Sequence, residues 1–139
     1  FPGGRMESGD VDVLSCALRE AEEEVGIRPA DVSVIGRLRR VVTRTGYTIH
    51  PVIGTLPDDY HFIANDGEVA ELLEVPLVWL MDRKSVRNEA FLQPSGSIDL
   101  RRTYAFGSHL IFGATGRIIT DFLDSCPKLG REVPRVSVK

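Results

Sequence analysis

The chain has 139 residues, of which 42% are hydrophobic and 27% charged, and its formal net charge is −3. This length suits one domain with a real core, and this composition is ordinary for a soluble globular protein. The small net charge gives no general electrostatic reason to expect binding to nucleic acid or membranes, and no apolar run approaches the roughly 18 residues that span a bilayer. Two cysteines, Cys16 and Cys126, form neither a disulfide framework nor a metal cluster, so we expect a reducing compartment, the cytoplasm.

The chain opens on FPGG, which is typical of a strand that ends in a turn. Because the first residue is not methionine, we expect residues upstream of Phe1 to be missing from this sequence. The genomic sequence before Phe1 is therefore the simplest information that would distinguish between the candidate functions.

A helix is predicted from about Val13 to Val25. Asp10 or Asp12 could cap its first turn, since a carboxylate can accept hydrogen bonds from the free backbone N–H groups there. Gly26 can adopt the left-handed conformation that ends a helix.

Runs of β-prone residues and turn formers follow this helix and indicate further elements. Pro76 favours a switch into a short helix, because proline suits the first turn of a helix. The expected elements are strands at Val32–Leu38 and Tyr47–Leu56 with RTG as a turn, a polar loop over residues 57–67, a short helix near Leu77–Met81, a hairpin of NEAFLQ and IDLRRTYAF closed around PSGS, an amphipathic helix over roughly Ala114–Leu123, and a loose tail. Strands with an early and a late helix favour an α+β or a layered α/β/α domain.

The first helix carries an apolar stripe that we expect to pack on the sheet, and two sets of charged residues beside it. At about 100° per residue, Glu20 and Glu24 project together, one turn apart, at the edge of this stripe. Arg19 and Glu23 form an i,i+4 pair further round, and Glu22 points to the opposite flank.

Two neighbouring carboxylates repel each other unless a cation lies between them. Mg²⁺ suits such a pair, because it binds one or two carboxylates and completes its octahedron with water and substrate phosphates. Arg19 could orient Glu23 beside such an ion. The alternative is an ordinary solvated acidic face, which is the usual meaning of such a run. Gly3-Gly4 favours the metal site, since glycine lets the backbone approach a ligand closely and present a carbonyl.

The combined string resembles the Nudix box, whose pattern is Gx5Ex7REUxEExGU with U an aliphatic residue. REAEEEVGI, residues 19–27, fits the second half position by position, and Gly4 fits the opening glycine. Residues 5–18 lie between Gly4 and Arg19, one residue more than the pattern has. The expected glutamate therefore falls at Asp10 or Val11, and the role of Asp10 stays open.

This lengthened box looks like that of the coenzyme A diphosphohydrolase branch of the Nudix family. Two further segments, NDGEVAELLEVPL (Asn65–Leu77) and HLIFGATGRII (His109–Ile119), are similar to segments of that branch. In its closing IWGATA motif, Phe112 stands here in place of tryptophan and Gly116 in place of the last alanine. The resemblance implies that the first strands of the fold, and a signature bearing arginine and serine, precede Phe1.

The resemblance implies cleavage of a diphosphate by water, with Mg²⁺ or Mn²⁺ as cofactor and a carboxylate that takes the proton. Many Nudix enzymes recruit a further glutamate from a distant loop; Glu68 is the first candidate and Glu71 the second, and a surface residue at a strand edge is the alternative for Glu68. Arginines of GRLRRVVTRTG could contact substrate phosphates, although a solvated strand face is the ordinary meaning. The expected metal ligands are Glu20, Glu24, Glu23 and the Gly4 carbonyl; the expected catalytic residues are Arg19, Glu20, Glu23, Glu24 and Glu68; and the expected phosphate-binding residues are Arg37 and Arg40.

The resemblance therefore implies an α/β fold, a Nudix-type α/β/α sandwich with a mixed sheet between helices, in a single domain over residues 1–125 followed by a flexible tail over 126–139. The implied reaction cleaves coenzyme A or its thioesters into 3′,5′-ADP and (acyl-)4′-phosphopantetheine. Two alternatives stay open: a Nudix diphosphatase for ADP-ribose, a dinucleotide or a nucleoside triphosphate, and a non-catalytic nucleotide-binding module, against which the complete REAEEEVG argues. We expect a small-molecule substrate rather than nucleic acid or a membrane, and a homodimer is left open.

Overall fold

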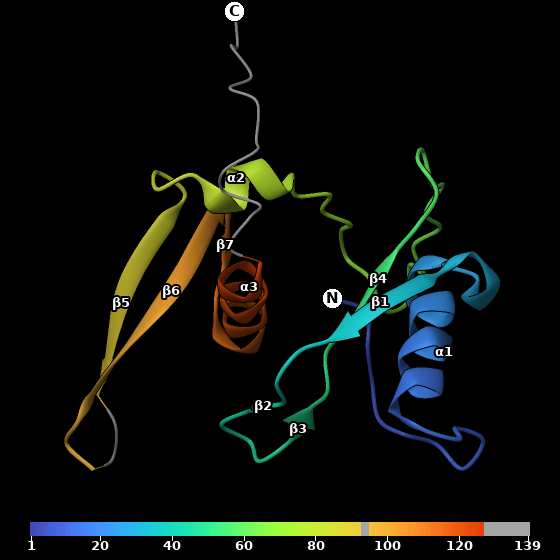
Figure 1. The fold of residues 1–139 in the computed structure, drawn as a ribbon, viewed down its shortest axis with the longest axis horizontal. Helices are drawn as coiled ribbons and strands as arrows, with labels where there is room; N and C mark the ends of the chain where they lie inside the picture. Colours follow the sequence, from blue (N-terminus) through green and yellow to red (C-terminus); the bar gives the residue numbers. More distant parts are fainter. Residues whose placement is uncertain (93–94, 127–139) are drawn as a thin grey trace, which may run out of the picture. The chain divides into compact units, whose positions relative to one another are not determined.

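The computed structural model describes residues 1–92 and 95–126, which fall into two compact units. Unit 1 comprises Phe1–Arg40 and Thr48–Leu73, and unit 2 comprises Val41–Tyr47 and the described residues from Glu74 onward. The elements of unit 1 are α1 (Val13–Val25), the 3-10 helix η1 (Pro29–Asp31), β1 (Ser33–Arg37), β3 (Thr48–Ile49) and β4 (Val52–Thr55), and those of unit 2 are β2 (Val41–Val42), α2 (Leu77–Met81), β5 (Val86–Leu92), β6 (Ile98–Phe106), β7 (His109–Ile111) and α3 (Gly113–Ser125) (Figure 1).

Helix α1 begins and ends where the sequence predicts. Of the two candidate caps, Asp12 is the one used: its Oδ1 accepts hydrogen bonds from the backbone N–H groups of Leu14 at 3.0 Å and Ser15 at 2.9 Å. The Ser15 hydroxyl accepts in turn from the Asp12 N–H at 2.9 Å, which completes a capping box. Gly26 ends the helix at φ 71°, a left-handed conformation that glycine adopts without a steric penalty.

Strands β1 and β4 form an antiparallel pair in unit 1, with an irregularity between Val34 and Gly36. The predicted strand Tyr47–Leu56 is interrupted, because Pro51 has no N–H to donate to a ladder; β3 lies before it and β4 after it. Strand β1 is one residue shorter at each end than the predicted strand Val32–Leu38, so Arg37 is its last residue and Arg40 lies beyond it.

Unit 2 is built on the antiparallel sheet β5-β6-β7, and α3 packs against β6. The predicted hairpin is confirmed, with a register that runs from Val86 opposite Tyr104 to Leu92 opposite Ile98. Residues 93 and 94 of its connection lie outside the described residues. Helix α3 begins one residue earlier and ends two residues later than the predicted Ala114–Leu123.

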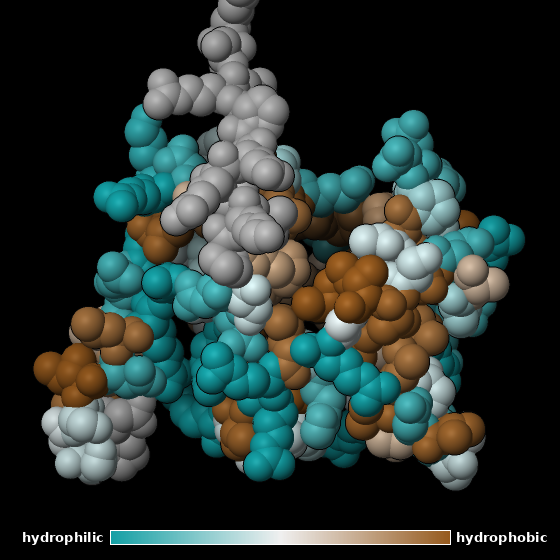
Figure 2. All heavy atoms as spheres, in the orientation of Figure 1, coloured by the Kyte–Doolittle hydropathy of each residue, from teal (hydrophilic) through white to brown (hydrophobic). Residues whose placement is uncertain are grey.

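The core of unit 2 joins two helices and one strand. Leu80 of α2, Tyr104 of β6 and Ile119 of α3 are buried together, and Leu123 packs against them as the predicted apolar face of the last helix requires. The far end of the hairpin is different, since Leu92, Ile98 and Leu100 are 77%, 68% and 71% exposed. Figure 2 shows this apolar end of the hairpin as brown side chains at the lower left.

The mixture of helices and sheet confirms the α/β class. The strand pairs found within the two units, β1–β4, β5–β6 and β6–β7, are antiparallel, so the parallel pairs of a mixed sheet are not among them. The predicted tail lies outside the described residues from position 127. None of the helices in the described part of the chain is both long enough and apolar enough to cross a membrane.

Candidate active site

Arg19 lies at the centre of a network of acidic side chains that joins α1 to the opening loop. Its Nε and Nη2 donate to Oδ1 and Oδ2 of Asp10, both at 3.1 Å. Its Nη1 donates to Glu23 Oε2 at 2.9 Å and lies 3.0 Å from Glu20 Oε1, and Nη2 also donates to the Arg5 carbonyl at 3.1 Å. One guanidinium therefore ties the loop to the helix and neutralises part of the acidic charge on α1.

The predicted pair of Arg19 and Glu23 is confirmed, and Asp10 proves to be the second anchor of the same arginine. The Asp10 side chain is only 4% exposed and also accepts the Glu7 N–H at 2.8 Å. The hydrogen bonds from Arg19, and then that from Glu7, hold the pKa of Asp10 below its ordinary value. The same contact with Asp10 is the main reason why the pKa of Arg19 is raised. The sequence signal for this role was the position of the box glutamate, which falls at Asp10 or its neighbour.

We expect Asp10→Asn to lower the melting temperature at neutral pH by a few degrees, because the amide loses the charge-assisted clamp on Arg19. A carboxyl with a lowered folded-state pKa stabilises the fold above its unfolded pKa and loses that contribution as pH falls through the folded value. The difference between the melting temperatures of the two proteins should therefore become smaller below pH 3.8, the ordinary pKa of aspartate. Thermal unfolding measured from pH 7 down to pH ~2.5 checks this, since that range brackets the titration of aspartate. A difference that stays constant over the whole range would contradict it.

The Glu20 carboxylate lies directly against Gly4. A Cβ added at position 4 would lie 2.6 Å from Glu20 Oε2, closer than non-bonded atoms approach, so a larger residue there would displace the Glu20 carboxylate from this position. The Glu20 side chain is 14% exposed. The Gly4 carbonyl accepts a weak hydrogen bond from the thiol of the buried Cys16 at 3.9 Å, and burial raises the pKa of that thiol. The structure thus places the Glu20 carboxylate against the backbone of Gly4, and both residues were predicted to supply oxygen ligands.

A segment distant in sequence binds the C-terminal end of α1. The Ile63 N–H donates to the Val25 carbonyl at 3.0 Å, and the Asn65 N–H donates to the Glu24 carbonyl at 2.8 Å. Three residues later, the Glu68 N–H donates to the Asn65 carbonyl at 2.9 Å, and the Glu68 side chain is exposed. The glutamate predicted from a distant loop therefore lies on a segment that is hydrogen-bonded to the backbone of Glu24. Glu71, the second candidate, lies exposed beyond it.

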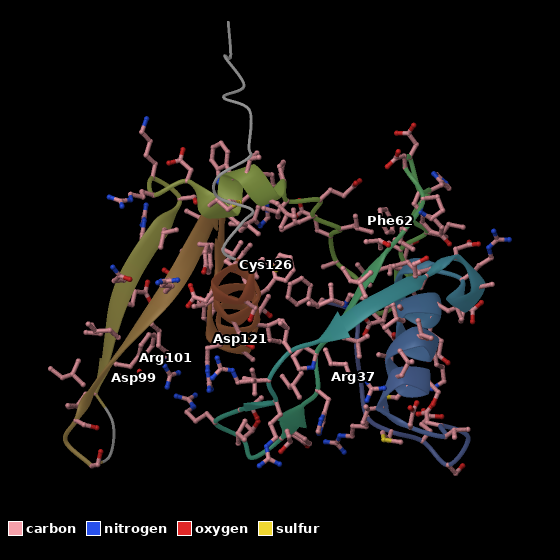
Figure 3. All side chains as sticks on the ribbon, viewed as in Figure 1. Arg37, Phe62, Asp99, Arg101, Asp121 and Cys126 are labelled. Atoms are coloured by element: carbon pink, nitrogen blue, oxygen red, sulfur yellow. The ribbon has the colours of Figure 1, made fainter. Side chains whose placement is uncertain are left out.

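The two arginines expected to meet substrate phosphates lie at the end of β1 and beyond it. Arg37 Nη2 is 3.7 Å from Oδ2 of Asp12. The other oxygen of the same carboxylate, Oδ1, caps α1. Figure 3 shows Arg37 beside the N-terminal end of α1. Arg40 is exposed three residues later.

The chemistry of the donors fits a hard divalent ion. Within residues 1–92 and 95–126, no three His, Cys, Asp or Glu side chains form a group arranged to hold a metal, and Arg19 supplies the positive charge beside Glu20 and Glu23. The carboxylates of Glu20 and Glu24 and the Gly4 carbonyl are nonetheless the oxygen ligands that Mg²⁺ and Mn²⁺ prefer. The Glu20 carboxylate occupies the space that a Cβ at position 4 would fill. A carboxylate therefore lies beside the backbone of Gly4, whose carbonyl oxygen is the other candidate ligand.

Comparison with known proteins agrees with this geometry. The chain is 47% identical over 77 residues to the "Uncharacterized Nudix hydrolase NudL" of Citrobacter koseri, and 48% identical over the same length to proteins of that name from Escherichia fergusonii and Escherichia coli. Each alignment covers 55% of this chain and 40% of the relative, so the chain spans less than half the length of these curated relatives. A family model described as the NUDIX domain matches residues 1–93, which contain the Arg19 network and the segment bearing Glu68. The chain belongs to the Nudix family.

Proposed function

We propose that the protein is a Mg²⁺- or Mn²⁺-dependent diphosphohydrolase that cleaves coenzyme A or its thioesters into 3′,5′-ADP and (acyl-)4′-phosphopantetheine. The observation that carries the proposal is the network around Arg19, which gathers Asp10, Glu20 and Glu23 at one side of α1 beside Gly4. A non-catalytic module has no need for so many carboxylates held in one place, since like charges repel one another. The relatives that share this part of the chain are named as hydrolases.

Each residue of the network has a role in this proposal. Glu20, Glu24 and the Gly4 carbonyl would hold the metal, with Glu23 as a further ligand. A bound divalent ion would neutralise phosphate charge and lower the pKa of a coordinated water. Arg19 acts as a positioning residue, because its fork fixes the Glu23 carboxylate and is itself fixed by Asp10.

Glu68 is the proposed general base. Two observations support this role: the segment of Glu68 is hydrogen-bonded to the Glu24 backbone through Asn65, and the Glu68 side chain is exposed. A general base has to come within hydrogen-bond reach of the water, directly or through one further water. An exposed side chain on a loop has the freedom to do so when the substrate binds.

Coenzyme A as the substrate is supported by the lengthened loop between Gly4 and Arg19 and by the similarity of two further segments to the coenzyme A branch. Arg37 and Arg40 would meet the additional phosphate charge of this substrate, since guanidinium groups bind phosphates through paired hydrogen bonds. Phe112, which replaces a tryptophan of that branch, is 61% exposed and so does not fill the core of unit 2.

A substrate panel tests the proposal. We expect the full-length protein with Mg²⁺ or Mn²⁺ to convert coenzyme A into two products with the masses of 3′,5′-ADP and 4′-phosphopantetheine. A much higher kcat/KM for ADP-ribose or a nucleoside triphosphate would leave the metal site standing and replace the substrate. No cleavage of any compound by folded, metal-loaded, full-length protein would contradict the enzyme itself and favour the binding module.

A further inference from the structure

Strand β5 is the outer strand of the sheet β5-β6-β7, so one of its edges meets no strand among the described residues (Figure 1). The Ala105 N–H donates to the Ser85 carbonyl at 2.8 Å, and these two residues continue the β5–β6 register. Because hydrogen-bonded residues alternate along an antiparallel pair, the odd-numbered residues of β5 direct their backbone groups toward β6. The backbone N–H and C=O groups of the even-numbered residues, from Val86 to Leu92, therefore point to the open edge.

Opposite charges stand two residues apart on this edge strand. Arg87 and Glu89 lie on the same face of β5, on either side of Asn88. Neither of them forms an ion pair with another residue of the described ranges. Glu89 stands opposite Arg101 of β6, whose guanidinium is held by Asp99 at 2.7 Å (Figure 3).

We propose that β5 pairs antiparallel with β5 of a second copy of this chain, about a two-fold axis at Asn88. Asn88 then faces Asn88, and Val86 faces Ala90, as pairs that exchange both backbone hydrogen bonds, which the outward direction of their N–H and C=O groups allows. Arg87 of each copy faces Glu89 of the other in the intervening pairs, where side chains approach more closely. The same patch serves both copies, as a two-fold dimer requires.

The charges of Arg87 and Glu89 favour this register over the two adjacent ones. An axis at Glu89 would set two carboxylates directly opposite each other, and an axis at Arg87 would set two guanidinium groups opposite each other; both arrangements are destabilising. Only the axis between them sets each positive charge against a negative one. The order of charges on β5 is therefore complementary to itself, which is why a second copy of the chain is the occupant. Pairing would also cover an edge that no strand of the described residues covers, and such edges tend to pair with other chains.

Charge reversal tests the pairing. Sedimentation of the unaltered chain over a range of concentrations should show a monomer–dimer equilibrium. Arg87→Glu and Glu89→Arg each place two pairs of like charges across the axis and should weaken dimerisation at least about tenfold. An equimolar mixture of the two variants should recover the dimer, because every facing pair in the heterodimer again has opposite charges. Arg44→Glu and Asp58→Arg, reversals at exposed residues outside β5, should leave the equilibrium unchanged.

A cross-link reports the register directly. In a hydrogen-bonded antiparallel pair the two Cα atoms are about 5.5 Å apart, which suits a disulfide. Asn88→Cys should therefore form a covalent dimer under mild oxidation, whereas the unaltered chain and Glu89→Cys should not. Circular dichroism spectra matching that of the unaltered chain show that each variant is folded. A chain that stays monomeric at all concentrations, or a dimer that is indifferent to both reversals or not restored by mixing them, would overturn the proposal.

Discussion

Glu24→Gln is expected to reduce turnover at least about a hundredfold while leaving the fold intact. A metal contributes several kcal/mol to the stabilisation of transition-state charge, and about 1.4 kcal/mol corresponds to a tenfold change in rate. Glutamine keeps the size of the side chain but removes one anionic ligand. The Glu24 carbonyl, which accepts the Asn65 N–H at 2.8 Å, belongs to the backbone and is unaffected.

Steady-state rates over a titration of Mg²⁺ and Mn²⁺ measure this effect, and thermal unfolding without metal shows whether the fold is kept. Without metal, we expect the variant to melt at the same temperature as the unaltered protein or higher, because it relieves repulsion between Glu20 and Glu24. Glu22→Gln is the matched control: it removes the same charge from the same helix at an exposed position and should keep full activity. Full activity of Glu24→Gln at saturating Mg²⁺ would make the acidic run an ordinary solvated face.

Arg19→Lys is expected to lower both metal affinity and turnover by about 10- to 100-fold, the usual effect of losing a group that orients metal ligands. Arg19 uses three nitrogens at once, with Nε and Nη2 on Asp10 and Nη1 on Glu23. A lysine ammonium keeps the charge but is a single point on a flexible stem, so it cannot span Asp10 and Glu23 in this fixed geometry.

Arg28→Lys controls for the general cost of the exchange. Arg28 also binds an aspartate with two nitrogens, since Nε and Nη2 donate to Asp31 at 2.7 and 3.1 Å, but it lies outside the carboxylate network on α1. We expect its activity to be unchanged. If Arg19→Lys also left both kcat/KM and the metal affinity unchanged, the positioning role of Arg19 would be wrong.

Elements with a strong local signal could be predicted closely. Local residues set both ends of helix α1: a capping box at its start and a glycine at its end. The short helix α2 begins directly after Pro76 as expected. Predictions failed where one local feature acts against a longer pattern: Pro51 divides a β-prone run that reads as one strand, because a single missing N–H breaks the ladder.

The site divides in a similar way. Helical periodicity alone places Arg19 one turn from Glu23 and Glu20 one turn from Glu24, because neighbours on a helix face are separated by three or four residues. Asp10 could not be assigned from the sequence, because the loop that carries it is one residue longer than the Nudix pattern and no periodicity governs a loop. Its place in the site follows from a buried carboxylate that accepts two hydrogen bonds from Arg19.

Residue types and their spacing within a few turns of chain are enough to establish the family resemblance, the helix that bears the acidic residues and the identity of the candidate ligands. The groups that meet across longer separations are known from the folded chain alone. The fold places Glu20 against Gly4, ties Asn65 to the backbone of Glu24 and leaves one edge of β5 without a neighbouring strand among the described residues. Such contacts depend on how the chain closes its loops, and loop closure is governed by packing and hydrogen bonding rather than by any local pattern of residues.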